Sequence, residues 1–391
     1  MNRFLLVLAT LCAAFGLAAQ ASDSLDFPQP QFMNPIYDSF SRNYYSTSAM
    51  GRGYTGIALP GETDNALLNP AAYLSEKASL HLEMLIKPPV NVNYYGEDDN
   101  LTSPAPFGIV AAGTKLGEHF SGALLYSLPK TLHLDDFSID MNMGYYLLMR
   151  YPTFNLHQLT ANAAWHSGDF HVGLNLHNQF YYLSDITILR TFERIRDAKY
   201  VLRPQLGLLY SGEKINAGLT VTPPQDLTWK FKDYVTYDTT LPLNAAFGAA
   251  CKLKKTSFTG EVEFEQCSAI SDAYSDRVNV RLGAETTIRR FSYRAGYIYS
   301  PEVWHGYYRL PMNNTANADS AIWWGDVAPG GYLGKNTQHI LTVGTSWHHQ
   351  DVNVNLGFLM DVAGKAPVAQ VNASIDLYFS AFKNKKFLYF D

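Results

Sequence analysis

The sequence predicts an all-β fold, a transmembrane antiparallel β-barrel of about 14 strands, and three observations support this. Of the 391 residues, 14% are aromatic and only 17% are charged, a balance typical of proteins with aromatic girdles at the membrane surfaces. After residue 21, no apolar run reaches the roughly 18 residues of a spanning helix. Many segments instead alternate apolar and polar side chains with a period of two, which favours strands with one apolar and one polar face.

The first element is a predicted signal peptide, residues 1–21. Arg3 precedes an apolar run, and the run ends at Ala19-Gln20-Ala21, which has the small-x-small form of a cleavage site. We therefore expect an exported protein whose mature chain begins near Ser22. Cys251 and Cys267 are then the only cysteines, too few for a fold held together by disulfides.

The connections between the expected strands give their number. Short polar turns are predicted at residues 116–119, 166–169, 211–214, 253–256, 288–290 and 348–351. Longer loops alternate with them, at residues 88–105, 129–152, 184–199, 223–239, 266–275, 301–336 and 363–367. Short turns at one end and long loops at the other are typical of outer-membrane barrels, and here they join about 14 strands. The barrel is thus expected over residues 78–379, followed by a C-terminal extension, residues 380–391.

Alternation also assigns the two faces of each strand. Leu174 is expected to face lipid, and its neighbour Asn175 to face the lumen. The same reasoning places a group of charged side chains in the lumen: Glu261, Glu263, Arg277 and Arg281. We expect Glu263 to lie opposite Arg277 as a cross-strand ion pair. Charges of this kind neutralise one another more often than they bind a ligand.

A glycine-rich stretch precedes the first strand, and its Gly51, Gly53 and Gly56 have the G-x-G-x-x-G spacing of a dinucleotide-binding turn. That turn needs a buried apolar strand before it and a helix after it. The preceding residues are polar and aromatic, and Pro60 follows too soon for a helix to develop. The sequence therefore argues against a nucleotide site here.

The same stretch, "GRGYTGIALPGETDNALLNPAAYL", resembles the N-terminal hatch of the FadL family, outer-membrane transporters of long-chain fatty acids whose relatives carry aromatic hydrocarbons. The residues that carry the resemblance are Gly51, Gly53, Gly56, Asn69, Pro70 and Ala71. It implies a monomeric barrel in the bacterial outer membrane, with its lumen plugged by an N-terminal extension and hatch, residues 22–77. It further implies that outer loops capture a fatty acid, aromatic hydrocarbon or other lipid, which leaves sideways through the wall when the hatch moves.

The loop at residues 184–199 is the candidate ligand-binding element. Its spacing predicts an amphipathic helix with Ile188, Leu189, Phe192 and Ile195 on an apolar stripe and with Arg190 and Arg194 beside it. Such a stripe suits an acyl chain, and the arginines suit its carboxylate. An equally good interpretation is that the stripe packs against neighbouring loops.

Other chemistry is poorly supported. No G-x-S-x-G is present, and the scattered histidines lack metal partners at usable spacing, so we expect no enzyme, no cofactor and no metal. The net charge of −5 comes without a basic stripe, which argues against nucleic-acid binding. Two functions stay open. One is an outer-membrane channel for uptake of hydrophobic small molecules, and the other is a FadL-like scaffold or shuttle that works with a periplasmic or secretion partner in protein secretion or surface attachment.

Overall fold

The computed structural model describes residues 40–74, 77–94, 97–103, 107–135, 137–141, 145–149, 153–188, 193–231, 235–270, 274–303, 308–312, 323–327, 337–349, 351–364 and 367–379. The expected signal peptide, residues 22–39 of the expected N-terminal extension and hatch, and the C-terminal extension lie outside these ranges. Among the described residues, no helix combines the length and the apolar character needed to cross a bilayer.

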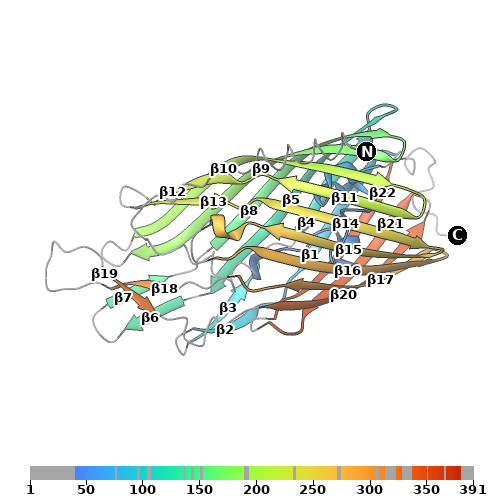
Figure 1. The fold of residues 1–391 in the computed structure, drawn as a ribbon. Coiled ribbons are helices and arrows are strands. Elements are labelled where there is room, and N and C mark those ends of the chain that lie inside the picture. The colour runs from blue at the N-terminus through green and yellow to red at the C-terminus, as the bar shows by residue number, and fades with distance from the viewer. Residues whose placement is uncertain are drawn as a thin grey trace.

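The strands form a closed 14-stranded antiparallel barrel (Figure 1), which confirms the predicted fold class. Its wall consists of β1 (Ser79–Ile86), β4 (Phe107–Lys115), β5 (Phe120–Asp135), β8 (Thr153–Ser167), β9 (Phe170–Ile188), β10 (Glu193–Ser211), β11 (Ile215–Thr222), β14 (Asn244–Leu253), β15 (Thr256–Glu265), β16 (Arg277–Ile288), β17 (Phe291–Ser300), β20 (Gln338–His349), β21 (Val352–Asp361) and β22 (Ala369–Tyr378). The first and last strands, β1 and β22, pair with each other, and β5 pairs with β8, so the ring has no free edge.

The two ends of the barrel differ. Short turns join neighbouring strands at one end, at all six predicted places. At the other end the long connections carry hairpins (Figure 1): β2 (Val90–Tyr94) with β3 (Glu97–Thr102), β6 (Phe137–Met141) with β7 (Tyr145–Met149), β12 (Gln225–Phe231) with β13 (Val235–Leu241), and β18 (Tyr308–Met312) with β19 (Trp323–Val327). A 3-10 turn, η4 (Cys267–Ala269), lies in the connection between β15 and β16.

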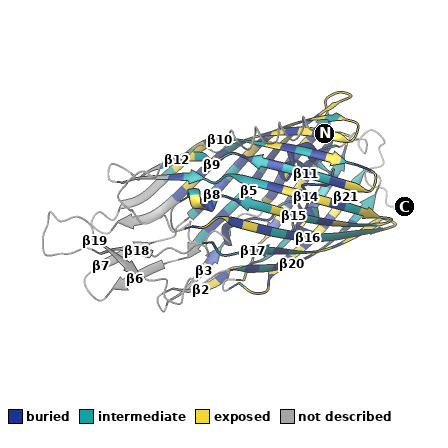
Figure 2. Cartoon of the chain, in the orientation of Figure 1, coloured by how far each residue is buried: buried dark blue, intermediate teal, exposed yellow. Residues whose placement is uncertain are grey.

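Exposure alternates along the strands (Figure 2), as their period of two requires. On β9, Val172, Leu174 and Leu176 are between 37% and 44% exposed on the outside, whereas Asn175 is fully buried inside. An apolar exterior around a polar interior is the inverse of a soluble protein and suits a barrel surrounded by lipid.

The N-terminal segment 40–74 fills the lumen (Figure 1). It contains α3 (Thr47–Gly51), η2 (Thr63–Leu67) and η3 (Pro70–Ala72). These short helices touch different parts of the wall: α3 contacts β17, β20 and β21, η2 contacts β1, β4 and β5, and η3 contacts β8, β9 and β10. We call residues 40–74 the hatch.

Glycines in the wall let the hatch backbone approach closely. Four pairs of them lie directly opposite each other on neighbouring strands: Gly173 with Gly207, Gly218 with Gly248, Gly283 with Gly296, and Gly344 with Gly357. A Cβ atom on Gly296 would lie 2.1 Å from the backbone nitrogen of Gly53 in the hatch. Gly53 itself has φ 69°, a left-handed conformation that favours glycine. The small residues of the G-x-G-x-x-G stretch thus serve backbone-to-backbone packing between hatch and wall.

One expected element is wrong. The predicted helix at residues 184–199 is absent from the described part of that segment, because β9 continues to Ile188 and β10 begins at Glu193. Pairing between β9 and β10, which extends to Ile188 opposite Glu193, overrides the helical spacing of the apolar residues.

Candidate functional site

A cavity of about 340 Å³ lies between the hatch and the end of the barrel that carries the long connections. The hatch contributes Arg42, Asn43, Tyr44, Tyr45 and Tyr54 to its lining. Eight wall strands, the β12–β13 hairpin and the η4 connection contribute the rest, including Phe154, Leu156, Tyr181, Leu227, Cys267, Ile270 and Tyr274. The lining is therefore mixed, with aromatic and aliphatic surface beside a set of charged groups.

Three tyrosines of the hatch form an aromatic cluster beside the cavity. The rings of Tyr44 and Tyr45 both stand edge-on to Tyr54, with ring centroids 5.1 and 5.9 Å away. The guanidinium of Arg281 lies over the Tyr54 ring at 5.1 Å, a cation–π contact. Burial raises the pKa of Tyr45 and Tyr54, so both phenols are neutral. The cluster offers a rigid aromatic surface to an apolar ligand.

An ion network joins the hatch to β15 and β16. Arg42 donates from both terminal nitrogens to the Glu265 carboxylate, at 3.0 Å each, and Arg277 donates to the same carboxylate at 3.1 Å. Arg281 pairs with Glu263 and lies 3.7 Å from Glu261. These carboxylates and guanidiniums line or adjoin the cavity and largely neutralise one another.

The predicted register of this network was wrong by two residues. Arg277 lies opposite Glu265, and Glu263 lies opposite Asn279. The shift of two keeps every side chain on its predicted face, and the expected pairing of Glu263 with Arg277 is replaced by Glu263 with Arg281.

Arg203 on β10 differs from the other cavity cations. Its Nε and Nη2 atoms donate to the carbonyl of Pro223 at 3.3 Å, and Nη2 also donates to the carbonyl of Pro242. No carboxylate in the described part of the chain forms an ion pair with it. A cation bonded only to carbonyl groups at a cavity wall is available to an anionic ligand group.

The cavity reaches the wall at β5, where Pro129 and Lys130 line it. The pairing of β5 with β8 shifts register between Ser127 and Lys130. On its other side, β5 pairs with β4 only up to Ser127 and with β3 only from His133 onward. Pro129 has no N–H to donate to a neighbouring strand. The wall is thus interrupted beside the cavity.

The hatch covers this interruption from inside. Arg42 forms an isolated β-bridge with Lys130. The backbone nitrogen of Asn43 donates to the carbonyl of Pro129 at 2.9 Å, and its side-chain nitrogen donates to the carbonyl of Leu128 at 2.8 Å. The first residues of the hatch therefore occupy positions that the neighbouring wall strand leaves unpaired.

The motif residues of the hatch hold it to the opposite wall. Asn69 donates to the carbonyls of Ile57 at 2.7 Å and Leu208 at 3.0 Å, and its side-chain oxygen accepts from the backbone nitrogen of Ala71. The backbone nitrogens of Gly56 and Ile57 donate to one oxygen of Glu261, at 2.5 and 2.6 Å. Two further motif residues pack directly on the wall: Pro70 against Gly173, and Gly51 against Gly344. Glu261 is therefore a hatch anchor, a role its alternation pattern did not reveal.

Of the six predicted ligand-binding residues, the structure places three in strands, and their role in binding stays a prediction. Ile188 is the last residue of β9, and Arg194 and Ile195 belong to β10. Leu189, Arg190 and Phe192 fall outside the described residues. The cavity-lining tyrosines and Arg203 were missed because the hatch brings them together from distant parts of the chain.

These features define a class: a closed barrel with an apolar exterior, plugged by its own N-terminal segment, with a cavity above the plug. No protein-family model matches the sequence, and no curated protein matches it. Solved structures do match.

A Pseudomonas aeruginosa FadL homologue is similar with a TM-score of 0.59 at 11% identity, over 87% of this chain and 99% of that chain. The Ralstonia pickettii toluene transporter TbuX gives a TM-score of 0.59 at 13% identity, over 85% of this chain and 97% of that chain. The Pseudomonas putida toluene transporter TodX gives a TM-score of 0.59 at 12% identity, over 86% of this chain and 98% of that chain. The protein therefore has the fold of the FadL-family outer-membrane transporters.

Proposed function

We propose that this protein is an outer-membrane channel for the uptake of hydrophobic small molecules, long-chain fatty acids or aromatic hydrocarbons. The observation that carries the proposal is the cavity itself, which lies between the long connections and the hatch and adjoins an interruption of the wall. Two of the similar structures are toluene transporters and one is a FadL homologue, which supports a ligand of this kind.

The route follows from the arrangement of cavity and hatch. A ligand enters from the end with the long connections and rests against Tyr45 and Tyr54. Its onward path towards the short-turn end is filled by the hatch, whose core includes Met50 and Ala71, both fully buried. The remaining way out is sideways past Pro129, into the surrounding lipid, where an apolar molecule is more stable than in water. This exit opens when Arg42 and Asn43 leave β5.

The wall interruption makes this opening local. Strand β5 loses its partner on one side beyond Ser127, so displacement of the first hatch residues breaks the bonds of Asn43 and the bridge of Arg42 and leaves the rest of the barrel ladder intact. The hydrogen bonds of Asn43 to β5 are neutral and contribute about 1 kcal/mol each. The same displacement breaks the charged hydrogen bonds of Arg42 to Glu265 and of Lys87 to Arg42, which contribute about 1.5 to 3 kcal/mol each. All of these contacts belong to the hatch, so they can break without unfolding the barrel.

The test is ligand binding to the purified full-length chain in detergent. We expect the lipid extract to contain a fatty acid or similar apolar molecule, identified by mass spectrometry, and a photoreactive fatty acid to label the cavity at Tyr45. The matched control is Tyr200, an exposed tyrosine on the outside of β10, where labelling should not be displaced by excess unlabelled ligand. Equal, non-displaceable labelling of both tyrosines would refute the proposal. A protein that co-purifies in place of any small molecule would favour the scaffold function.

A further inference from the structure

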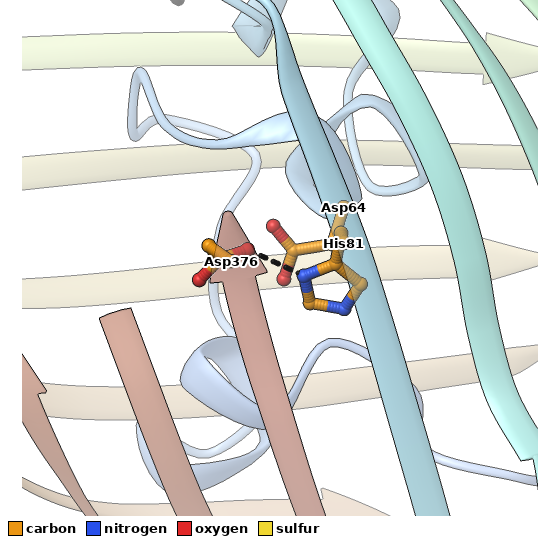
Figure 3. A group of neighbouring side chains, drawn as sticks. All are labelled: Asp64, His81 and Asp376. Carbon is orange, nitrogen blue, oxygen red and sulfur yellow. Dashed lines mark hydrogen bonds and ion pairs between the residues drawn. The ribbon is translucent and has the colours of Figure 1, made fainter. Parts of the chain in front are cut away.

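A second cluster of polar side chains lies where the hatch meets the first and last strands of the barrel (Figure 3). Asp64 comes from η2 of the hatch, His81 from β1 and Asp376 from β22. Each is at most 4% exposed. One potential metal-ligand atom from each lies within 4.8 Å of the others. Imidazole nitrogen and carboxylate oxygen are common ligands of divalent transition metals.

The contacts within the cluster are short. The Nδ1 atom of His81 lies 2.6 Å from Oδ1 of Asp376. Asp64 accepts a hydrogen bond from the hydroxyl of Ser46 at 2.6 Å, and Asp376 accepts one from the side-chain nitrogen of Asn355 at 3.1 Å. Figure 3 shows both carboxylates beside the Nδ1 side of the imidazole ring. The two carboxylates are thus oriented by neutral groups, as metal-binding carboxylates usually are.

The other ring nitrogen, Nε2 of His81, is buried and has no hydrogen-bond partner in the described structure. It lies 4.0 Å from the nearest oxygen of Glu83, which accepts from the backbone nitrogen and hydroxyl of Thr47. Nε2 therefore faces a third buried carboxylate across a gap too long for a hydrogen bond. A buried polar atom such as Nε2 without a hydrogen-bond partner lowers the stability of the fold.

The cluster is rich in buried carboxylates. No Lys or Arg of the described chain is ion-paired with Asp64, Asp376 or Glu83, and the basic side chain among them is His81. An excess of buried carboxylates of this kind is relieved by bound protons or by a metal ion.

We propose that Asp64, His81 and Asp376 bind a divalent transition-metal ion of the Zn²⁺ type. The metal takes the place of the proton between His81 Nδ1 and Asp376, and Asp64 supplies the third ligand. The remaining position goes to water, a common arrangement for three protein ligands. His81 then carries its proton on Nε2, which faces the Glu83 carboxylate at 4.0 Å, and the negative charge of Glu83 favours that proton without a hydrogen bond. A soft-to-borderline ion is favoured over Mg²⁺ or Ca²⁺ because of the imidazole.

The proposed ion would cross-link the hatch to the wall. The three ligands belong to the hatch and to the two strands whose pairing closes the barrel. A bound ion therefore ties the hatch to the wall at the side of the lumen that carries the short turns. This role is separate from ligand uptake and does not depend on it.

The test uses the full-length chain, purified with a tag that contains no histidine, stripped with a chelator and then titrated with Zn²⁺ alone. We expect about one Zn²⁺ per chain after gel filtration. Asp64→Asn and His81→Gln each remove a ligand and should weaken binding by at least the roughly 10- to 100-fold that loss of an outer-shell partner costs. Glu83→Gln should weaken binding less, because it removes a charge 4.0 Å from Nε2 and no hydrogen bond to the ring. Bound Co²⁺ should give visible absorbance bands that Asp64→Asn and His81→Gln lose. His177→Gln is the matched control, because His177 is a buried lumenal histidine whose partners, Thr160 and Gln205, are neutral.

Two results would overturn the proposal. The first is a wild-type chain that retains no Zn²⁺, and this result does not depend on any variant folding. The second is unchanged affinity in Asp64→Asn and Asp376→Asn, with heat-modifiable migration showing that both variants are folded. In either case Asp64, His81 and Asp376 form a cluster of hydrogen-bonded charged groups and do not bind a metal ion.

Discussion

A methyl group placed between hatch and wall tests the packing that closes the lumen. In Gly296→Ala the new Cβ would lie 2.1 Å from the Gly53 nitrogen and 2.5 Å from the Gly53 Cα, where ordinary contacts begin near 3.4 Å. All the nearest atoms are hatch backbone, which cannot rotate away, so the hatch must shift. The matched control is Gly260→Ala on β15, whose Cβ would meet only a Leu282 methyl group at 3.6 Å.

The size of the effect follows from the overlap. Inserting a methyl group into a packed interior costs about 1 to 3 kcal/mol, which raises the population of displaced hatch about 5- to 150-fold. A barrel of this strand number holds a water-filled channel once emptied. In planar bilayers we therefore expect channel openings to be more frequent for Gly296→Ala than for wild type. For Gly260→Ala we expect the same frequency of openings as for wild type. Equal, low conductance for all three proteins, each heat-modifiable, would refute the packing argument.

Three further predictions follow from the wall, the hatch and the cavity. Leu174→Arg should reduce assembly in vesicles, because a charge on the lipid face costs roughly 2 to 4 kcal/mol. Asn175→Arg should assemble but leak ions, since Asn175 donates a hydrogen bond to the hatch. If Asn175→Arg assembled less well than Leu174→Arg, the assignment of the two faces would be inverted. Lys87 donates hydrogen bonds to Phe40 and Arg42 of the hatch, and burial lowers its pKa to about 7. When the hatch leaves the wall, Lys87 returns to its ordinary pKa of 10.5 and takes up a proton. The docked hatch therefore becomes more stable relative to the undocked hatch as the pH rises from about 7 to 10.5. Over that pH range, maleimide should label Ser41→Cys progressively more slowly than it labels the double variant Ser41→Cys, Lys87→Met. The same dependence of labelling rate on pH in both proteins would count against a role for Lys87. Arg203→Met should weaken fatty-acid binding about tenfold and leave the matching alcohol unaffected; equal losses for both would assign Arg203 a packing role.

The barrel was predictable because its pattern is local. Alternation along β9 and β11 and the polar turns between strands are fixed by neighbouring residues, so the strand number and the faces agree with the structure. The register between β15 and β16 was not predictable, because it depends on where the connection at residues 266–276 begins and ends. A shift of two residues preserves the faces, so alternation alone cannot detect it.

The sites depend on contacts between distant segments. Asp64, His81 and Asp376 have no recognisable spacing, and they meet only because β1 pairs with β22 and the hatch folds back against both. The cavity likewise joins Tyr45 of the hatch to Arg203 of β10. The resemblance of residues 49–74 to a FadL hatch predicted that such contacts would exist, but the residues on the wall that make them required the structure.

The most direct test of the plugged channel measures uptake and conductance on the same preparation. Full-length protein is reconstituted into vesicles, and saturable uptake of a radiolabelled long-chain fatty acid and of toluene is recorded beside ionic current in planar bilayers. The sideways route past Pro129 predicts uptake of at least one ligand above protein-free vesicles, with low current, and a large current when residues 22–74 are deleted. A full-length protein that conducts like an open porin, or that takes up neither ligand, would contradict the account.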